Sequence, residues 1–270
     1  MVKNITVADL PQDKYQRVSQ LREELAELFE KREFMVSYER NQLNALYVEL
    51  IGRLLYEEFA LKTDIRKSKR IAELVQAKMN RGEAVDMGTI EQIVEKEFAE
   101  YRRQLEEQLN QIKAAQELLA APMLSEEDTT ELKSIYRLLA KRLHPDWNPN
   151  QTEREKELFI RAQAAYKSCD LQELRNILQM LEVKSEDELN DDNVDEKIKQ
   201  LEACLEDIRS RIDKLNETFP FTYKELLKDP KWVEQEQNRI QESINALTKE
   251  KQLWSVYAST QMGSISIGQA

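Results

Sequence analysis

One short stretch, LLAKRLHPDWNPN (residues 138–150), contains His144, the single histidine among 270 residues, followed by Pro145 and Asp146. An imidazole and a carboxylate two positions apart can exchange protons or make directional hydrogen bonds. Acid–base catalysis would also need a concave pocket and a further partner group, and the surrounding sequence displays neither. We therefore expect no catalytic residue here, and we expect the two side chains to contact another macromolecule.

Two helices must position this tripeptide. The segment SEEDTTELKSIYRLLAKRL has apolar residues at helical spacing: Leu132, Ile135, Tyr136, Leu139 and Leu143. Pro145 disfavours helical geometry at His144, so the first helix should end there. After a polar turn, REKELFIRAQAAYKSCD predicts a second helix with small alanines that allow close packing. The pattern predicts two antiparallel helices with His-Pro-Asp exposed at the connecting turn.

The other face of the first helix is basic, although the whole chain is acidic. It has 40 basic and 51 acidic residues, which gives a net charge of −11. The basic side chains on that face are Lys133, Arg137, Lys141 and Arg142. A basic face on an acidic protein would steer an acidic protein partner and set its association rate. The net charge and the lack of interleaved exposed aromatic residues argue against nucleic acid as that partner.

The stretch IYRLLAKRLHPDWNPN resembles a signature of the J-domain proteins, the co-chaperones of DnaK-type heat-shock chaperones. The positions that match the family's Y-R-x-L-A-x-K/R-x-H-P-D pattern are Tyr136, Arg137, Leu139, Ala140, Arg142, His144, Pro145 and Asp146. In LFIRAQAAY, the family's third-helix pattern is matched by Phe159, Ala165 and Tyr166. The resemblance covers roughly 70 of the 270 residues.

The resemblance implies a function. His144, Pro145 and Asp146 would touch the nucleotide-binding domain of a DnaK-type chaperone near its interdomain linker. The four basic side chains would dock on acidic surface there. Docking would trigger ATP hydrolysis by the chaperone, which would then trap its client protein. The chain itself would bind no nucleotide, need no cofactor and perform no chemistry.

The sequence departs from the family pattern in several places. Trp147 stands where the family usually has a basic residue, and Leu138 occupies a position that is often basic. The usual first-helix signature is missing, and QELLAAPML, at the end of a long preceding helix, stands in its place. These departures keep an alternative open, in which the fold is a degenerate J-like scaffold of coiled coils that is not coupled to a chaperone.

Composition excludes several other classes of protein. The glycines number five, and none lies between Thr89 and Met262. Phosphate-binding loops and dinucleotide turns need glycine, so neither is expected in that range. Cys169 and Cys204 are isolated, which argues against a disulfide framework or a zinc site. The glycine/phenylalanine-rich and zinc regions of general-purpose J-domain proteins are absent, and this matches the specialised class in which other regions select the client or location.

The remaining sequence is helical. Apolar residues recur at helical spacing on both sides of NRGEAVDMG (residues 80–88), which predicts that residues 12–121 form a helical hairpin with a shorter leading helix. Towards the other end, a heptad seam consists of Ile198, Leu201, Leu205, Ile208, Ile212, Leu215 and Phe219. A partner helix can begin at Pro230, capped by Asp229. We expect an antiparallel coiled coil between these two helices, and a homodimer formed through the seam is the alternative.

These patterns predict an all-α protein with four parts. Residues 1–111 form an N-terminal hairpin arm, 112–181 a J domain, 182–196 an acidic linker, and 197–270 a C-terminal antiparallel coiled coil with a tail. The linker contains eight acids and one lysine. Neither a signal peptide nor an apolar run of about 20 residues is evident, so we expect a cytosolic protein with no membrane span. The client protein has no recognisable signature in the arms.

Overall fold

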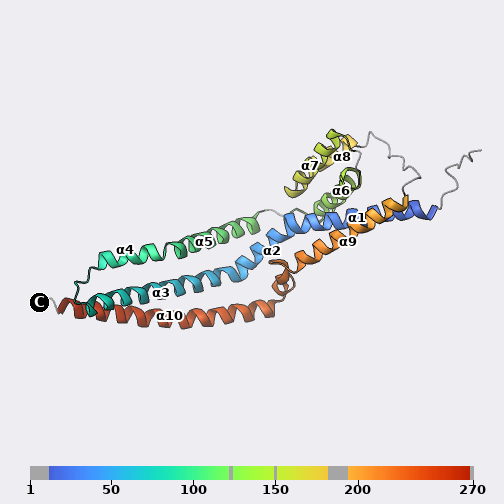
Figure 1. Ribbon diagram of the computed structural model, residues 1–270. Helices are drawn as coiled ribbons and strands as arrows, with labels where there is room; N and C mark the ends of the chain where they lie inside the picture. Colours follow the sequence, from blue (N-terminus) through green and yellow to red (C-terminus); the bar gives the residue numbers. More distant parts are fainter. Residues whose placement is uncertain (1–11, 122–123, 149–150, 182–193, 268–270) are drawn as a thin grey trace, which may run out of the picture. The chain divides into compact units, whose positions relative to one another are not determined.

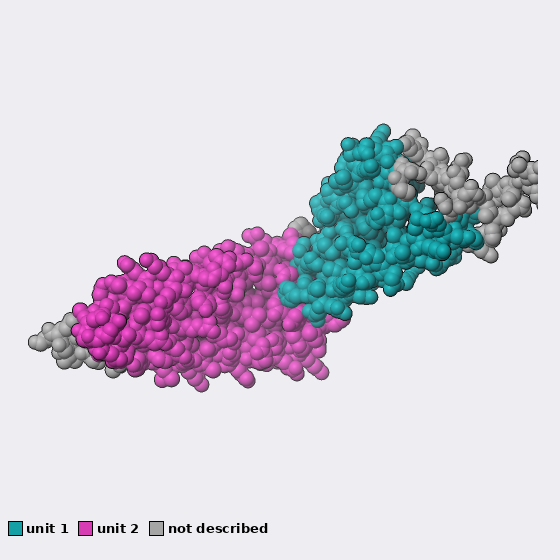
Figure 2. Space-filling view, in the orientation of Figure 1, with its two compact units in different colours: residues 1–41, 122–222 teal, residues 42–121, 223–270 magenta. Residues whose placement is uncertain are grey.

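The computed structural model describes residues 12–121, 124–148, 151–181 and 194–267. Over these ranges the protein is all-α, as predicted, and contains no strand. The chain divides into two compact units, each built from two separate stretches of sequence (Figure 2). Residues 1–41 and 122–222 make unit 1, and residues 42–121 and 223–270 make unit 2.

The described residues of unit 1 form a bundle of five α-helices. They are α1 (Gln12–Phe34), α6 (Glu126–Leu143), α7 (Glu153–Lys167), α8 (Leu171–Leu181) and α9 (Val194–Asn216). Helix α1 packs along α9 and also against α6, while α6, α7 and α8 all pack on one another (Figure 1). A π-helical turn, η1 (Met35–Glu39), follows α1.

Local signals explain where the helices of unit 1 begin and end. Ser125 caps α6 by accepting a hydrogen bond from the Asp128 N–H at 3.0 Å. Thr152 and Glu155 form a capping box at the start of α7. Cys169 has a positive φ of 56°, which lets the chain reverse between α7 and α8. In the segment that resembles a J domain (the J-like segment, residues 125–181), the ends of α6 and α7 are therefore determined by residues of the segment itself.

Unit 2 contains the predicted helical hairpin. Its elements are the π-helical turn η2 (Val48–Gly52), α3 (Arg53–Asn80), α4 (Met87–Glu97), α5 (Ala99–Ala120), the short 3-10 helix η5 (Leu226–Lys228) and α10 (Pro230–Ile267). The division between the units falls within α2 (Arg40–Tyr47) and within the 3-10 helix η4 (Phe221–Tyr223). After α3 the chain turns at Gly82, which has a φ of +68°. Helices α4 and α5 then pack back against α3. Asp86 caps α4, and Asp229 accepts a hydrogen bond from the Lys231 N–H at 3.0 Å at the start of α10.

One hydrophobic core cluster of unit 2 joins α10 to the turn η2, before α3. Ile51, Ile240 and Ile244 are each at most 3% exposed and pack together. Polar contacts follow the same pair of helices: Gln237 donates to the Leu50 carbonyl at 2.8 Å, and Lys251 pairs with Asp64 at 2.5 Å. Residue numbers rise together on both helices, so α10 runs parallel to α3.

The predicted coiled coil between the two C-terminal helices is wrong. Helix α9 packs along α1, and α10 packs along α3. The ion pairs Lys14–Asp195 and Arg17–Glu202 show that α1 and α9 are also parallel. A heptad seam requires an apolar partner but specifies neither its identity nor its direction. Four residues of the seam, Leu201, Leu205, Ile208 and Ile212, are buried, as are Val18, Leu21 and Leu25 of the partner helix α1.

The predicted division into four consecutive parts also differs from the structure. The leading helix α1 belongs with the J-like segment and with α9 rather than with the hairpin. Helix α5, whose last residues fall within the predicted J domain (112–181), belongs to unit 2. Most of the predicted acidic linker, residues 182–193, lies outside the described residues. Among the described helices, none is long and apolar enough to cross a membrane.

Candidate docking site on helix α6

The turn after α6 is tightly held by its own backbone. The His144 N–H donates to the Ala140 carbonyl at 2.9 Å and ends the helix. The His144 carbonyl then accepts hydrogen bonds from the N–H groups of Trp147 and Asn148, at 3.1 and 3.0 Å. The Asn148 side chain returns to the Arg142 carbonyl at 2.7 Å. Because the carbonyls at the helix end are satisfied in this way, the tripeptide has a fixed conformation.

The His144 imidazole is buried, whereas the sequence predicts an exposed tripeptide. His144 is 9% exposed. Its ring stacks on the Trp147 indole with centroids 4.4 Å apart and an interplanar angle of 21°. The edge of Phe29, from α1, approaches the imidazole with centroids 4.5 Å apart. The prediction fails for His144 because Trp147 folds back over the imidazole and α1 closes the aromatic cluster.

Pro145 and Asp146 remain exposed at the turn, as predicted. The Asp146 side chain is 66% exposed, and its Oδ2 lies 3.8 Å from His144 Nδ1. The same Nδ1 accepts a hydrogen bond from the Asp146 N–H at 3.2 Å. Burial lowers the pKa of His144 below its ordinary value, and the Asp146 carboxylate opposes this shift. A partner therefore reaches a carboxylate and a proline at this turn, with a neutral imidazole behind them.

The predicted basic face of α6 is covered by α1. Lys141 Nζ lies 2.6 Å from a Glu23 carboxylate oxygen. Arg137 lies 3.2 Å from Glu27 and 3.6 Å from Glu30. The Lys133 ammonium sits 3.5 Å from the centroid of the Phe34 ring, a cation–π contact.

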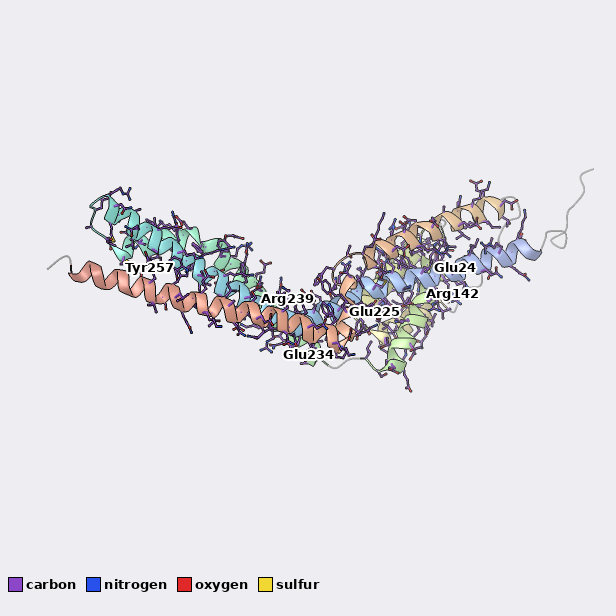
Figure 3. The ribbon with its side chains drawn as sticks, turned by 90° about the horizontal axis from the view of Figure 1, so that it is seen from below. Glu24, Arg142, Glu225, Glu234, Arg239 and Tyr257 are labelled. Atoms are coloured by element: carbon purple, nitrogen blue, oxygen red, sulfur yellow. The ribbon has the colours of Figure 1, made fainter. Side chains whose placement is uncertain are left out.

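Arg142 completes the set of basic side chains that the sequence singles out. Arg142 is exposed, and its guanidinium forms no ion pair within the described part of the chain. Figure 3 labels Arg142 in the last turn of α6 and Glu24 on α1, and shows the side chains along both helices. Of the four predicted cationic contacts, three are thus occupied within the chain, and Arg142 remains open to a partner.

The pairing between α1 and α6 follows one antiparallel register. Lys141 pairs with Glu23, and Arg137 pairs with Glu27. The residue number falls by four on α6 and rises by four on α1, so the two helices are antiparallel. Four residues span about one helical turn, which keeps successive pairs on one face of each helix. The acids of α1 therefore form a stripe that matches the basic stripe of α6, which can be recognised in the sequence only when both helices are compared.

A buried carboxylate anchors this interface. Glu30 is 5% exposed and accepts a hydrogen bond from the Tyr166 hydroxyl at 2.6 Å. The Tyr166 ring stacks on Tyr136, with centroids 4.0 Å apart, and Tyr136 is fully buried. Burial raises the pKa of the Tyr166 phenol, and the nearby Glu30 carboxylate raises it further. Both tyrosines of the J-like pattern therefore form part of the surface that α1 covers.

Helix α9 also reaches the turn. Lys197 Nζ donates to the Trp147 carbonyl at 3.2 Å. Burial lowers the pKa of Lys197, and the positive charge of Arg22 lowers it further. Within the described residues, no group of three or more His, Cys, Asp and Glu side chains is arranged to hold a metal ion. The arrangement offers charged and hydrogen-bonding groups for binding a protein surface.

No family model, no curated protein and no solved structure matches the chain. The likeness to J-domain proteins therefore rests on the residues of the α6–turn–α7 segment themselves. Their spacing and their place on two packed helices are the observations from which a function can be argued.

Proposed function

We propose that this protein is a J-domain co-chaperone that docks on a DnaK-type chaperone and stimulates its ATP hydrolysis. One observation carries the proposal: a hydrogen-bonded turn between two packed helices presents Pro145 and Asp146 to solvent beside the exposed Arg142. The pattern that resembles the family thus occupies a helix end, a fixed turn and the helix that follows. In this proposal the nucleotide is bound by the chaperone, and the hydrolytic chemistry belongs to the chaperone.

The site would act by selecting a conformation of its partner. Asp146 can accept directional hydrogen bonds, and the basic side chains of α6 can pair with an acidic surface. The turn that presents Asp146 is held by backbone hydrogen bonds and loses little conformational freedom on binding, so even a small contact can discriminate between two states of a partner. A contact that binds one state more tightly shifts the partner towards that state. Faster hydrolysis follows if the favoured state is the hydrolysing one.

The helices outside the J-like segment would select the client or the location. Unit 2 consists of long helices, and Leu253 and Val256 on α10 are 72% and 63% exposed. Exposed apolar side chains of this size are suited to contact another protein. A cytosolic location, expected from the sequence, is part of the same proposal, together with an unidentified client protein.

A second role is supported by a specific observation. Helix α1 covers most of the basic face of α6, and His144 is packed between aromatic rings. A J-like fold used only as a building block would have these features. In that case the protein would be a helical scaffold, and its tripeptide would serve to end α6.

Single-turnover ATP hydrolysis by a DnaK-type chaperone separates the two roles. We expect stimulation by the wild-type protein and its loss on Asp146→Asn, which removes a charge from an exposed side chain and should leave the fold intact. Circular dichroism and the melting temperature verify the fold of the variant. The wild type, and variants designed to weaken the α1–α6 ion pairs, should be compared. If none of them stimulates hydrolysis, the co-chaperone role is contradicted and the scaffold role is supported.

A further inference from the structure

Helix α1 occupies the surface through which α6 would dock on an acidic partner. We infer that α1 is an internal competitor for this surface, and that the acidic docking surface of the chaperone displaces it. This inference rests on the proposed function and adds its regulation. It makes the described arrangement the closed form of the protein, in which docking is restrained.

The charges of α1 are of the kind that the docking face should recognise. The partner is expected to present acids to Lys133, Arg137 and Lys141. Helix α1 presents Glu23 to Lys141 and both Glu27 and Glu30 to Arg137. Two acidic surfaces cannot occupy the same basic side chains at once, so binding of one excludes the other.

Aromatic contacts extend the cover from the basic face to the tripeptide. Phe29 lies against His144 and also approaches Trp147, with centroids 6.0 Å apart. Trp147 is 2% exposed, although it belongs to a surface turn. Removal of α1 from α6 would expose this indole and give the imidazole a route to solvent. Trp147 is therefore both a part of the cover and an optical reporter of it.

The cover can open because each side has packing of its own. Helices α6, α7 and α8 pack on one another, and Leu139 of α6 and Leu174 and Ile177 of α8 are buried. Helix α1 is separately tied to α9 through Arg17–Glu202 and Glu24–Arg209. The ion pairs between α1 and α6 involve side chains that are mostly a third to a half exposed, and such pairs are weak. Opening would separate two groups that each keep their own helix–helix packing, and it would also break the buried Tyr166–Glu30 hydrogen bond and the contacts of Phe29 with His144 and Trp147.

Competition of this kind lowers the apparent affinity for the chaperone. If only a fraction of the molecules is open, the apparent dissociation constant rises by the inverse of that fraction. Weakening the α1–α6 contact should therefore increase stimulation at low co-chaperone concentration and leave the saturated rate unchanged. A variant that altered the docking residues themselves would also change the saturated rate, so the concentration dependence distinguishes the two effects.

The test uses the full-length double variant Glu23→Lys/Glu27→Lys. Both side chains are exposed, so the substitutions should leave the α1–α9 pair folded while repelling α6. Trp232→Phe and Trp254→Phe make Trp147 the only tryptophan, and acrylamide quenching of its fluorescence reports the opening without any chaperone. We expect stronger quenching and about a fivefold to tenfold gain in stimulation at sub-saturating concentration.

Two further variants test whether the result depends on the α1–α6 contact or only on the change in net charge. Glu91→Lys/Glu106→Lys makes the same change of charge at exposed positions on α4 and α5, at which no ion pair is formed among the described residues. It should change neither the quenching nor the stimulation. Adding Lys141→Glu to Glu23→Lys restores an ion pair with reversed polarity, and it should return the quenching towards the wild-type value.

The outcomes separate the inference from the proposed function. Stronger quenching with unchanged stimulation would overturn the inference and leave the co-chaperone role intact. Stronger quenching without stimulation by any chain would overturn the co-chaperone role and the inference with it. If quenching stays unchanged even when Glu30→Lys, which places a cation beside Arg137, is added, then these contacts do not hold α1 on α6 and the inference fails.

Discussion

His144 shows how packing changes the properties of a single residue. Its ring is buried between Trp147 and Phe29, and this burial disfavours the charged imidazolium. The Asp146 carboxylate favours the imidazolium, but it is exposed to water and its effect is the smaller of the two. The imidazole is therefore neutral at physiological pH and packs as an aromatic ring, with Nδ1 as a hydrogen-bond acceptor.

The depressed pKa makes the stability of unit 1 depend on pH. Between the folded-state pKa and the ordinary value of 6.5, the unfolded chain binds more protons at His144 than the folded chain. The contribution of His144 to stability is therefore present above that window and is lost as the pH falls through it. We expect the stability of the wild type relative to His144→Gln to shrink between about pH 7.5 and about pH 5.5.

Urea unfolding of both proteins, at matched ionic strength, measures this difference. The carboxylates titrate in both chains, so their effect cancels when the two free energies of unfolding are subtracted. A difference that stays constant with pH would show that the imidazole titrates equally in the folded and unfolded states. A difference that grows at low pH would mean that folding favours the imidazolium, contrary to the burial seen here.

At the scale of single elements, the start of α7 fixes the far side of the turn. The Thr152 hydroxyl accepts a hydrogen bond from the Glu155 N–H at 3.3 Å, and the Glu155 carboxylate accepts one from the Thr152 N–H at 2.8 Å. Thr152→Ala removes one half of this capping box and should lower the free energy of unfolding by about 0.5–2 kcal/mol. Chemical denaturation measures the loss.

Thr130→Ala is the matched control for this cap. The Thr130 hydroxyl donates to the Glu126 carbonyl inside α6, so its removal costs no cap and places a better helix former on an exposed position. We expect a change close to zero or a small gain in stability. Equal losses from both substitutions would show that the capping box has no special part in holding the turn.

Elements were predictable from sequence to the extent that their signals are local. The amphipathic pattern, Pro145 and the polar turn place α6 and α7 correctly, and Asp229 with Pro230 marks the start of α10. The cover over the basic face was missed because it depends on two helices more than 100 residues apart, as in the Lys141–Glu23 pair. The acids of α1 at spacings of four and three residues were a visible signal, but an acidic stripe usually faces solvent.

At the scale of the whole molecule, the chain folds as two discontinuous units. Ile240, in unit 2, is 1% exposed and packs with Ile51 and Ile244. Truncation of a buried isoleucine leaves a cavity, so Ile240→Ala should cost about 2–5 kcal/mol. Hydrogen exchange should accelerate in α3 and α10 and stay unchanged in α6, α7 and α8, because these helices have a separate core.

Ile93→Ala is the control for that experiment, because Ile93 lies in the same unit but is 37% exposed. It should have a much smaller effect on exchange. Acceleration throughout the chain after Ile240→Ala would show that the two units unfold as one cooperative body. That result would contradict their independence and would couple the proposed client-selecting helices to the docking site.

The partners of the long helices could not be predicted from the sequence. The apolar seam of α9 is satisfied by Leu21 and Leu25 of α1, but the apolar face of α10 would satisfy a heptad pattern equally well. Hydrophobic burial depends on area and carries little directional information. Ion pairs such as Arg17–Glu202 distinguish the alternatives, and they involve flexible exposed side chains whose pairing a heptad pattern does not reveal.

The central claim is that one face of α6 serves both α1 and a DnaK-type chaperone. The most direct test is single-turnover ATP hydrolysis by the chaperone with three chains: the wild type, Glu23→Lys/Glu27→Lys, and that double variant with Asp146→Asn added. We expect the double variant to stimulate hydrolysis more than the wild type at low concentration, and we expect Asp146→Asn to abolish the stimulation. Stimulation that survives Asp146→Asn in the opened protein would contradict the claim, because the chaperone would then be docking elsewhere.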